Sequence, residues 1–175
     1  DGYWQSEEYF KDIKGIILKE FSFPPFDERN EACAKEIISS NSLSIHIRRG
    51  DFLNHPLYKD ICTLQYYQDA IKRICALAKI DHAFIFSNDI QWCEDNLSLF
   101  LNDQMTTYID WNKGSQSYND IHLMSLCKHN IIANSSFSWW GAWLNPNPDK
   151  VVISPRIWDN SGAVSNPICK DWIKI

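Results

Sequence analysis

The sequence predicts an α/β fold in which a parallel sheet is covered by helices on both faces. Four short, nearly continuous apolar runs, at 42–48, 82–86, 130–133 and 151–153, read as strands buried on both sides. Segments of helical periodicity separate them, which is the order that parallel strands with crossover helices require. At 175 residues the chain is long enough for one layered domain.

The first 40 residues predict two helices. From Ser6 a helical pattern places Tyr9, Ile13 and Ile16 on one face. This helix should end before Phe23, because two prolines follow and the residue before a proline is pushed out of the α region. A second helix is expected over 27–38.

The middle of the chain alternates strands and helices. The strand at 42–48 leads into a loop around Asn54 that is well placed to fold over a ligand. Thr63 is a candidate N-cap for a helix over 64–77. A strand at 82–86, a helix at 90–100 and a short strand at 105–109 follow.

The last third repeats this alternation. A helix is expected over 118–126, a strand at 130–133, and then a helix containing Trp139, Trp140 and Trp143 that Pro146 terminates. For the three tryptophans, packing is favoured over sugar contact, because aromatic rings dominate core packing. The strand at 151–153 ends at Arg156.

Composition limits the function classes. A net charge of −5 argues against a general nucleic-acid binder. The six cysteines form no C-x-x-C pair, which favours reduced, mostly buried thiols and a cytoplasmic location. No signal peptide is recognisable and no apolar run approaches the roughly 20 residues that span a bilayer. Without an initial methionine, the chain is expected to be a fragment.

Two arginines stand where the first strand ends. Because a strand sends successive side chains to opposite faces, Arg48 and Arg49 cannot both enter the core, and at least one should meet an anion. The alternative is a surface salt bridge with Asp51, which is common. Ligands of open α/β sheets bind outside the carboxyl ends of strands, and this favours the functional interpretation. Asp89 marks a second strand end.

A third polar strand end is rich in hydroxyl groups. Ser135, Ser136 and Ser138 lie where a strand meets a helix, whose first N–H groups attract phosphate. The alternative is that one serine merely caps the helix. Right-handed crossovers place the strand ends at one edge. One crevice should therefore be lined by Arg48, Arg49, Asp89, Ser135, Ser136 and Arg156.

The sequence offers no metal site for phosphate chemistry. It contains no D-x-D triplet, no H-E-x-x-H motif and neither of the common glycine-rich phosphate loops. If the ligand is a diphosphate, arginine side chains and helix-terminal amides must neutralise it. We therefore expect no metal requirement.

The segment from His46 to Asp51 resembles the H-x-R-R-x-D motif of α1,2-, α1,6- and protein O-fucosyltransferases. The chain is most similar to the α1,2-fucosyltransferases of glycosyltransferase family 11, with further matching segments at 86–89, 134–144 and 152–155. The resemblance implies the C-terminal half of a GT-B architecture. Residues 41–175 would form a Rossmann-like domain that binds GDP-fucose, and residues 1–40 a helical segment leading from a missing N-terminal acceptor domain.

The resemblance also implies roles for single residues. Arg48 and Arg49 would act on the diphosphate, with Asp51 orienting them, and these three are the expected catalytic residues. The remaining donor contacts it implies are His46, Asp89, Ser135, Ser136 and Ser138. For His46, a core histidine bonded to backbone is the alternative.

The implied reaction is inverting transfer of L-fucose from GDP-β-L-fucose to a galactoside 2-hydroxyl. The expected partners are GDP-fucose, a galactose-containing glycan and the acceptor domain, without nucleic acid, cofactor or metal. The catalytic base is not assigned. A bacterial cytoplasmic location is expected, with peripheral attachment at the inner membrane as a variant. The alternatives are a non-catalytic carbohydrate- or nucleotide-binding module and a transferase that uses another nucleotide sugar.

Overall fold

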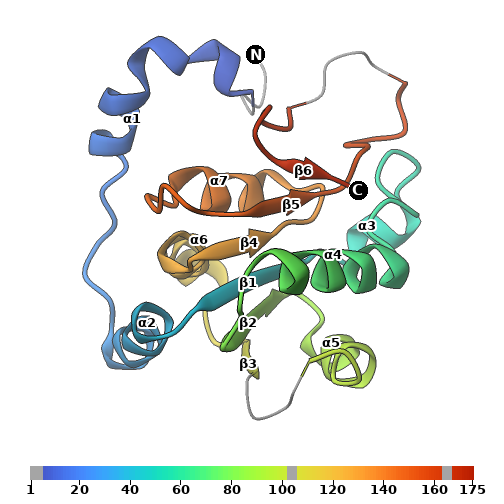
Figure 1. Ribbon diagram of the computed structural model, residues 1–175, viewed down its shortest axis with the longest axis horizontal. Helices are drawn as coiled ribbons and strands as arrows, with labels where there is room; N and C mark the ends of the chain where they lie inside the picture. The colour runs from blue at the N-terminus through green and yellow to red at the C-terminus, as the bar shows by residue number, and fades with distance from the viewer. Residues whose placement is uncertain (1–5, 102–105, 163–166) are drawn as a thin grey trace.

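The computed structural model describes residues 6–101, 106–162 and 167–175, and it contains a parallel sheet of six strands in the order β3-β2-β1-β4-β5-β6 (Figure 1). The strands are β1 Ser42–Ile47, β2 His82–Ser87, β3 Thr106–Ile109, β4 His129–Ile131, β5 Val152–Ser154 and β6 Ile173–Lys174. This is the doubly wound order, whose switch point lies between β1 and β4. The predicted α/β class with a parallel sheet is confirmed.

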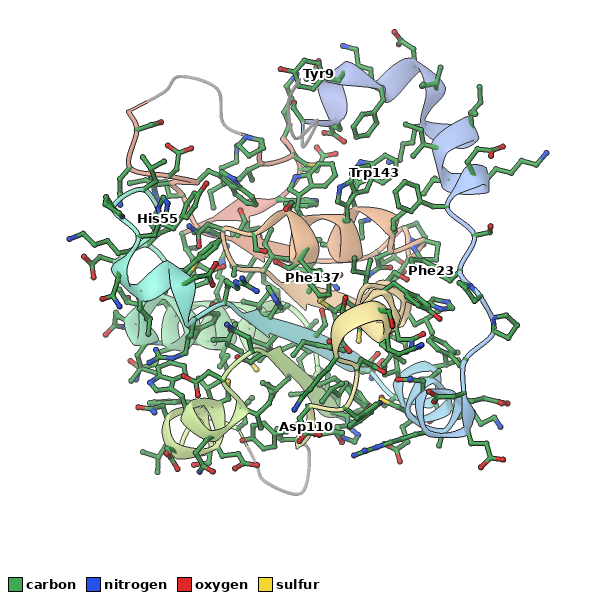
Figure 2. The ribbon with its side chains drawn as sticks, turned by 180° about the vertical axis from the view of Figure 1, so that it is seen from behind. Tyr9, Phe23, His55, Asp110, Phe137 and Trp143 are labelled. Carbon is green, nitrogen blue, oxygen red and sulfur yellow. The ribbon has the colours of Figure 1, made fainter. Side chains whose placement is uncertain are left out.

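Helices cover both faces of the sheet, as Figures 1 and 2 show from opposite sides. Helices α4 and α5 lie on one face, and α2, α6 and α7 lie on the other. The helices are α1 Lys14–Glu20, α2 Glu28–Ser39, α3 Asp51–Asn54, α4 Leu64–Leu77, α5 Ile90–Leu97, α6 Tyr118–Leu126 and α7 Ser136–Leu144; 3₁₀ turns span Glu7–Tyr9, Lys11–Ile13 and Gly114–Gln116. No described helix is both long and apolar enough to cross a bilayer.

Strand parity divides the core between the two faces. On β1, Ile45 and Ile47 point towards α4 and α5 and join the core cluster of those helices. On β2, Phe84 and Phe86 point the other way and pack with α2 and α6. Because α2 contributes Ile37 to that second cluster, the helix predicted within residues 1–40 packs directly on the sheet.

The tryptophans form a third cluster around α7. Trp139 and Trp143 are buried and pack with Ile132 and Val152 of the sheet region. The expectation that these rings pack in the core is confirmed for Trp139 and Trp143. Helices α6 and α7 approach so closely that a Cβ added at Gly141 would lie 2.9 Å from the Cβ of Met124.

The continuous helix predicted from Ser6 is wrong. Two 3₁₀ turns precede α1, and the backbone of Phe10 between them leaves the helical region, with φ −141° and ψ 15°. This bend allows the ring of Phe10 to enter the tryptophan cluster, where its centroid lies 5.2 Å from that of Trp143. Burial of the Phe10 ring thus favours the bend over a continuous helix from Ser6.

Other differences are smaller. The expected loop after β1 contains the short helix α3, and the two-residue strand β6 is an addition to the prediction. Met105, the first residue of one predicted strand, lies outside the described residues. The predicted cap at Thr63 is confirmed, since its side chain accepts from the N–H of Tyr66 at 3.3 Å. Asp27, where the second helix was expected to start, is the N-cap of α2 and accepts from the N–H of Asn30 at 2.8 Å.

Candidate functional site

A pocket of about 600 Å³ opens at the carboxyl ends of β1, β2 and β3. It lies on the face of the sheet that α6 and α7 cover, beside the switch point. Figure 2 labels two of its lining residues, Asp110 after β3 and Phe137 in α7. Of the residues predicted as a site, His46 and Arg48 line this pocket. Its volume is in the range of small-molecule sites.

Arg48 lines this pocket and has one unpaired donor. Its Nη2 lies 2.8 Å from Asp51 Oδ1, and its guanidinium lies 5.3 Å from the ring of Phe52. Its Nε is buried and has no hydrogen-bond partner among the described residues. A buried N–H without an acceptor is unfavourable, so an anionic ligand that accepts from Nε would remove this penalty. Asp51 thus contacts Arg48, as expected of a residue that orients it.

His46 is a buried, neutral imidazole. Its pKa is lowered to about 3, first because burial disfavours the charged ring and second because Arg48 is nearby. Its Nδ1 is buried without a partner in the described part of the chain, and its ring lies 5.5 Å from that of Phe137. Within that part of the chain, Nδ1 therefore makes no backbone hydrogen bond of the kind that the core-histidine alternative expects.

Asp120 in the first turn of α6 is one of two pocket carboxylates, with Asp110, that the prediction missed. It lines the pocket, and its Oδ1 accepts a hydrogen bond of 2.8 Å from Asn112, which is itself bonded to Asn30. Burial raises the pKa of Asp120 to about 7, against the opposing effect of the Asn112 bond. A turn-rich break after β3, followed by an acidic residue at a helix start, was the available signal.

Arg49 and Asp89 bind each other outside this pocket. Arg49 Nε donates to Asp89 Oδ2 at 2.9 Å, and the guanidinium stacks 4.0 Å above the ring of Trp92 in α5. Asp89 also caps α5 by accepting from the Trp92 N–H at 3.3 Å. Neither Arg49 nor Asp89 is among the residues that line the pocket, so their contact with a donor stays a prediction.

The three serines lie around the start of α7 but in different roles. Ser135 is the N-cap and accepts from the Phe137 N–H at 3.3 Å, as the capping alternative proposed. Ser138 is fully buried and donates to the carbonyls of Ala133 and Ser135. Ser136 is the first helical residue and is partly exposed. Donor binding by any of the three stays a prediction.

The described residues contain no group of three His, Cys, Asp or Glu side chains that could hold a metal ion. The charged groups in the pocket are instead an arginine, a lysine and two carboxylates, namely Arg48, Lys113, Asp110 and Asp120. Arg48 and Lys113 are the cationic groups suited to an anion there.

Comparison with known proteins identifies the family. The family described as Glycosyl transferase family 11 matches residues 1–175. The Escherichia coli O-antigen biosynthesis glycosyltransferase WbnK is 37% identical over 140 residues, which cover 78% of this chain and 45% of that protein. An Escherichia coli α-1,2-colitosyltransferase is 33% identical over 180 residues, covering 99% of this chain and 61% of that protein. The chain thus spans about half of the length of these curated relatives.

A solved structure supports the fold. NodZ α-1,6-fucosyltransferase, co-crystallised with GDP, superposes with a TM-score of 0.52 at 15% identity, covering 80% of this chain and 60% of that one. This likeness agrees with the Rossmann-like, GT-B type of domain expected from the sequence. The doubly wound sheet fits this fold, and the match over all 175 residues shows that the chain belongs to glycosyl transferase family 11.

Proposed function

We propose that this chain is the donor-binding part of an inverting α1,2-fucosyltransferase that transfers L-fucose from GDP-β-L-fucose to a galactoside 2-hydroxyl. The observation that carries the proposal is the unpaired, buried Nε of Arg48 in a pocket beside the switch point of the sheet. Membership of family 11 supports the reaction class. The part of the relatives' length that this chain does not cover would correspond to the acceptor domain.

The pocket suits a nucleoside diphosphate. Guanine carries an N–H and an NH₂ side by side, and a carboxylate accepts from such a pair through two oxygens, which makes Asp120 a suitable base contact. The diphosphate would then lie between Arg48 and the start of α7, where helix N–H groups and the dipole favour negative charge. His46 would pack between them as an uncharged group.

In the proposed reaction, the bond between C1 of fucose and the β-phosphate oxygen breaks, and its electron pair stays on GDP. The acceptor 2-hydroxyl forms a bond with C1 from the opposite side and gives its proton to a base. Arg48 and the helix terminus stabilise the charge that develops on the departing diphosphate. The proposed step needs no metal ion, because Arg48 and the helix terminus supply the positive charge.

Calorimetry with GDP in EDTA tests the proposal. The parent chain should bind GDP, and Arg48→Ala should lose at least tenfold in affinity, because a charge-assisted hydrogen bond contributes about 1.5–3 kcal/mol. Arg73→Ala is the matched control, since Arg73 is an exposed arginine of α4. Absence of GDP binding by correctly folded parent chain would refute the proposal. Binding of UDP or ADP as tightly as GDP would favour another nucleotide sugar.

A second donor sugar is favoured by one relative. The α-1,2-colitosyltransferase is similar over 99% of this chain, so nucleotide-activated colitose is the competing donor. Competition of GDP-fucose and activated colitose for the pocket, measured by calorimetry, separates the two candidates. Binding of glycans that Arg48→Ala leaves unchanged would instead indicate a carbohydrate-binding module.

We place the protein in the cytoplasm, since the six cysteines are free thiols.

A further inference from the structure

The side-chain amide of Asn88 holds the main chain one residue after Arg48. The pairing of β1 with β2 ends at Ile47 and Ser87. One residue beyond Arg48, the N–H of Arg49 donates to Asn88 Oδ1 at 2.9 Å, and Asn88 Nδ2 donates to the carbonyl of Arg49 at 3.2 Å. This exchange of two bonds resembles the pairing of two strand residues. Asn88 therefore extends the attachment of β1 to β2 past the last paired residues.

Gly50 makes this contact possible. Its φ is +63°, a conformation that L side chains rarely adopt, and a Cβ there would lie 2.8 Å from Asn88 Nδ2. The amide of Asn88 thus occupies the space that a side chain at position 50 would need. The turn at Gly50 also starts α3, which places Asp51 2.8 Å from Arg48.

These contacts fix Arg48 from both sides along the chain. Ile47 before it is paired in the sheet, and both main-chain polar groups of Arg49 after it are bonded to Asn88. Asn88 itself is exposed, so the two bonds contribute little to the free energy of unfolding. Their main effect is to hold the backbone at the mouth of the pocket in one geometry.

We propose that Asn88 is a positioning residue: through the Arg49 main chain it sets the Arg48 guanidinium for the diphosphate of the donor. The inference rests on the proposed function, because it assumes that Arg48 binds phosphate. It goes further by assigning a pocket-lining amide to the support of the arginine rather than to the ligand. Preorganised geometry of this kind is what makes a charged group effective in binding and catalysis.

The test compares GDP with guanosine, which lacks the phosphates. Asn88→Ala should weaken binding of GDP about tenfold or more while changing guanosine binding less than about twofold, since small displacements of a positioned group have large effects. Gly50→Ala keeps the Asn88 side chain but places a Cβ 2.8 Å from its Nδ2, which should displace the amide and give the same phosphate-selective loss. Gln91→Ala, which removes an exposed amide of α5, is the control.

The double variant separates positioning from direct contact. If Asn88 acts through the main chain, Asn88→Ala and Gly50→Ala disturb one interaction, and their effects on GDP binding will not add. Additive losses, equal losses of GDP and guanosine, or unchanged GDP binding by Asn88→Ala in a parent that binds GDP would each overturn the inference. A parent chain that does not bind GDP would instead refute the proposed function, and the inference with it. Thermal unfolding of every variant checks that it is folded.

Discussion

Replacing Asp120 with asparagine should stabilise the fold and weaken nucleotide binding at the same time. The folded chain raises the pKa of Asp120 from 3.8 to about 7, chiefly by burial. As the pH rises from about 4 to about 7, the unfolded chain ionises this group while the folded chain keeps its proton, so stability falls. A shift of about 3 units at about 1.4 kcal/mol each gives an upper bound of about 4 kcal/mol, reached above pH 7.

Asparagine removes this penalty and keeps the local geometry. Its side-chain oxygen can still accept from Asn112, which now donates to Asp120 Oδ1 at 2.8 Å. Asp120→Asn should therefore unfold at the same urea concentration as the parent near pH 4 and at a higher one at pH 8. The amide also replaces one carboxylate oxygen with a donor, so the guanine contact should lose about 1–3 kcal/mol of affinity.

Urea unfolding at pH 4, 6 and 8 and calorimetry with GDP at pH 8 measure both effects. Asp69→Asn is a suitable control, because Asp69 is an exposed carboxylate that bonds to Gln65. In the parent, GDP binding should weaken as the pH falls below 7 and Asp120 becomes protonated. Equal stability of parent and variant at pH 8 would show that burial does not penalise this carboxylate. Unchanged GDP affinity of the variant would exclude Asp120 as a base contact.

Three further substitutions separate support of the site from contact with the ligand. Gly141→Ala should lower the free energy of unfolding by about 1–3 kcal/mol, because its Cβ would lie 2.9 Å from that of Met124; thermal unfolding measures this. Lys150→Met should lower it by a similar amount, because the ammonium donates to carbonyls at the C-terminal end of α7, two of them at 2.8 Å. Ser138→Ala tests the predicted donor contact in calorimetry: a loss of GDP affinity above about threefold supports direct contact, whereas a smaller loss shows that the hydroxyl serves only its bonds inside the turn.

The regular elements were predictable because their signals are local. Apolar runs placed β1, β2, β4 and β5 within one or two residues, and Thr63 caps α4 as predicted. The bend at Phe10 was not predictable, since its cause is a tryptophan cluster more than 100 residues away in the chain. Strand β6 has two residues, too few for a periodic pattern.

The sequence predicted where the pocket lies on the sheet, but not which of the polar residues line it. The edge of the sheet that the strand ends predicted carries the pocket, and His46 and Arg48 line it. Asp120 was missed because its burial depends on how the start of α6 meets the segment after β3, where Asn112 bonds to it, and no local pattern reports this contact. Likewise, only the structure shows that Arg49 and Asp89 satisfy each other 2.9 Å apart.

The two adjacent arginines act on opposite sides of the sheet because of strand parity. Arg48 continues the face of His46, towards the pocket, whereas Arg49 continues the face of Ile47, towards Trp92. A lysine at either position keeps the charge but loses the planar group. Arg48→Lys should therefore weaken GDP binding without loss of stability, because Nε is the unpaired donor. Arg49→Lys should mainly lower thermal stability, because one ammonium cannot both stack on Trp92 and bond to Asp89 as the guanidinium does. If both variants lost GDP affinity and thermal stability to the same extent, the two arginines would not have the separate roles inferred from the opposite directions of their side chains.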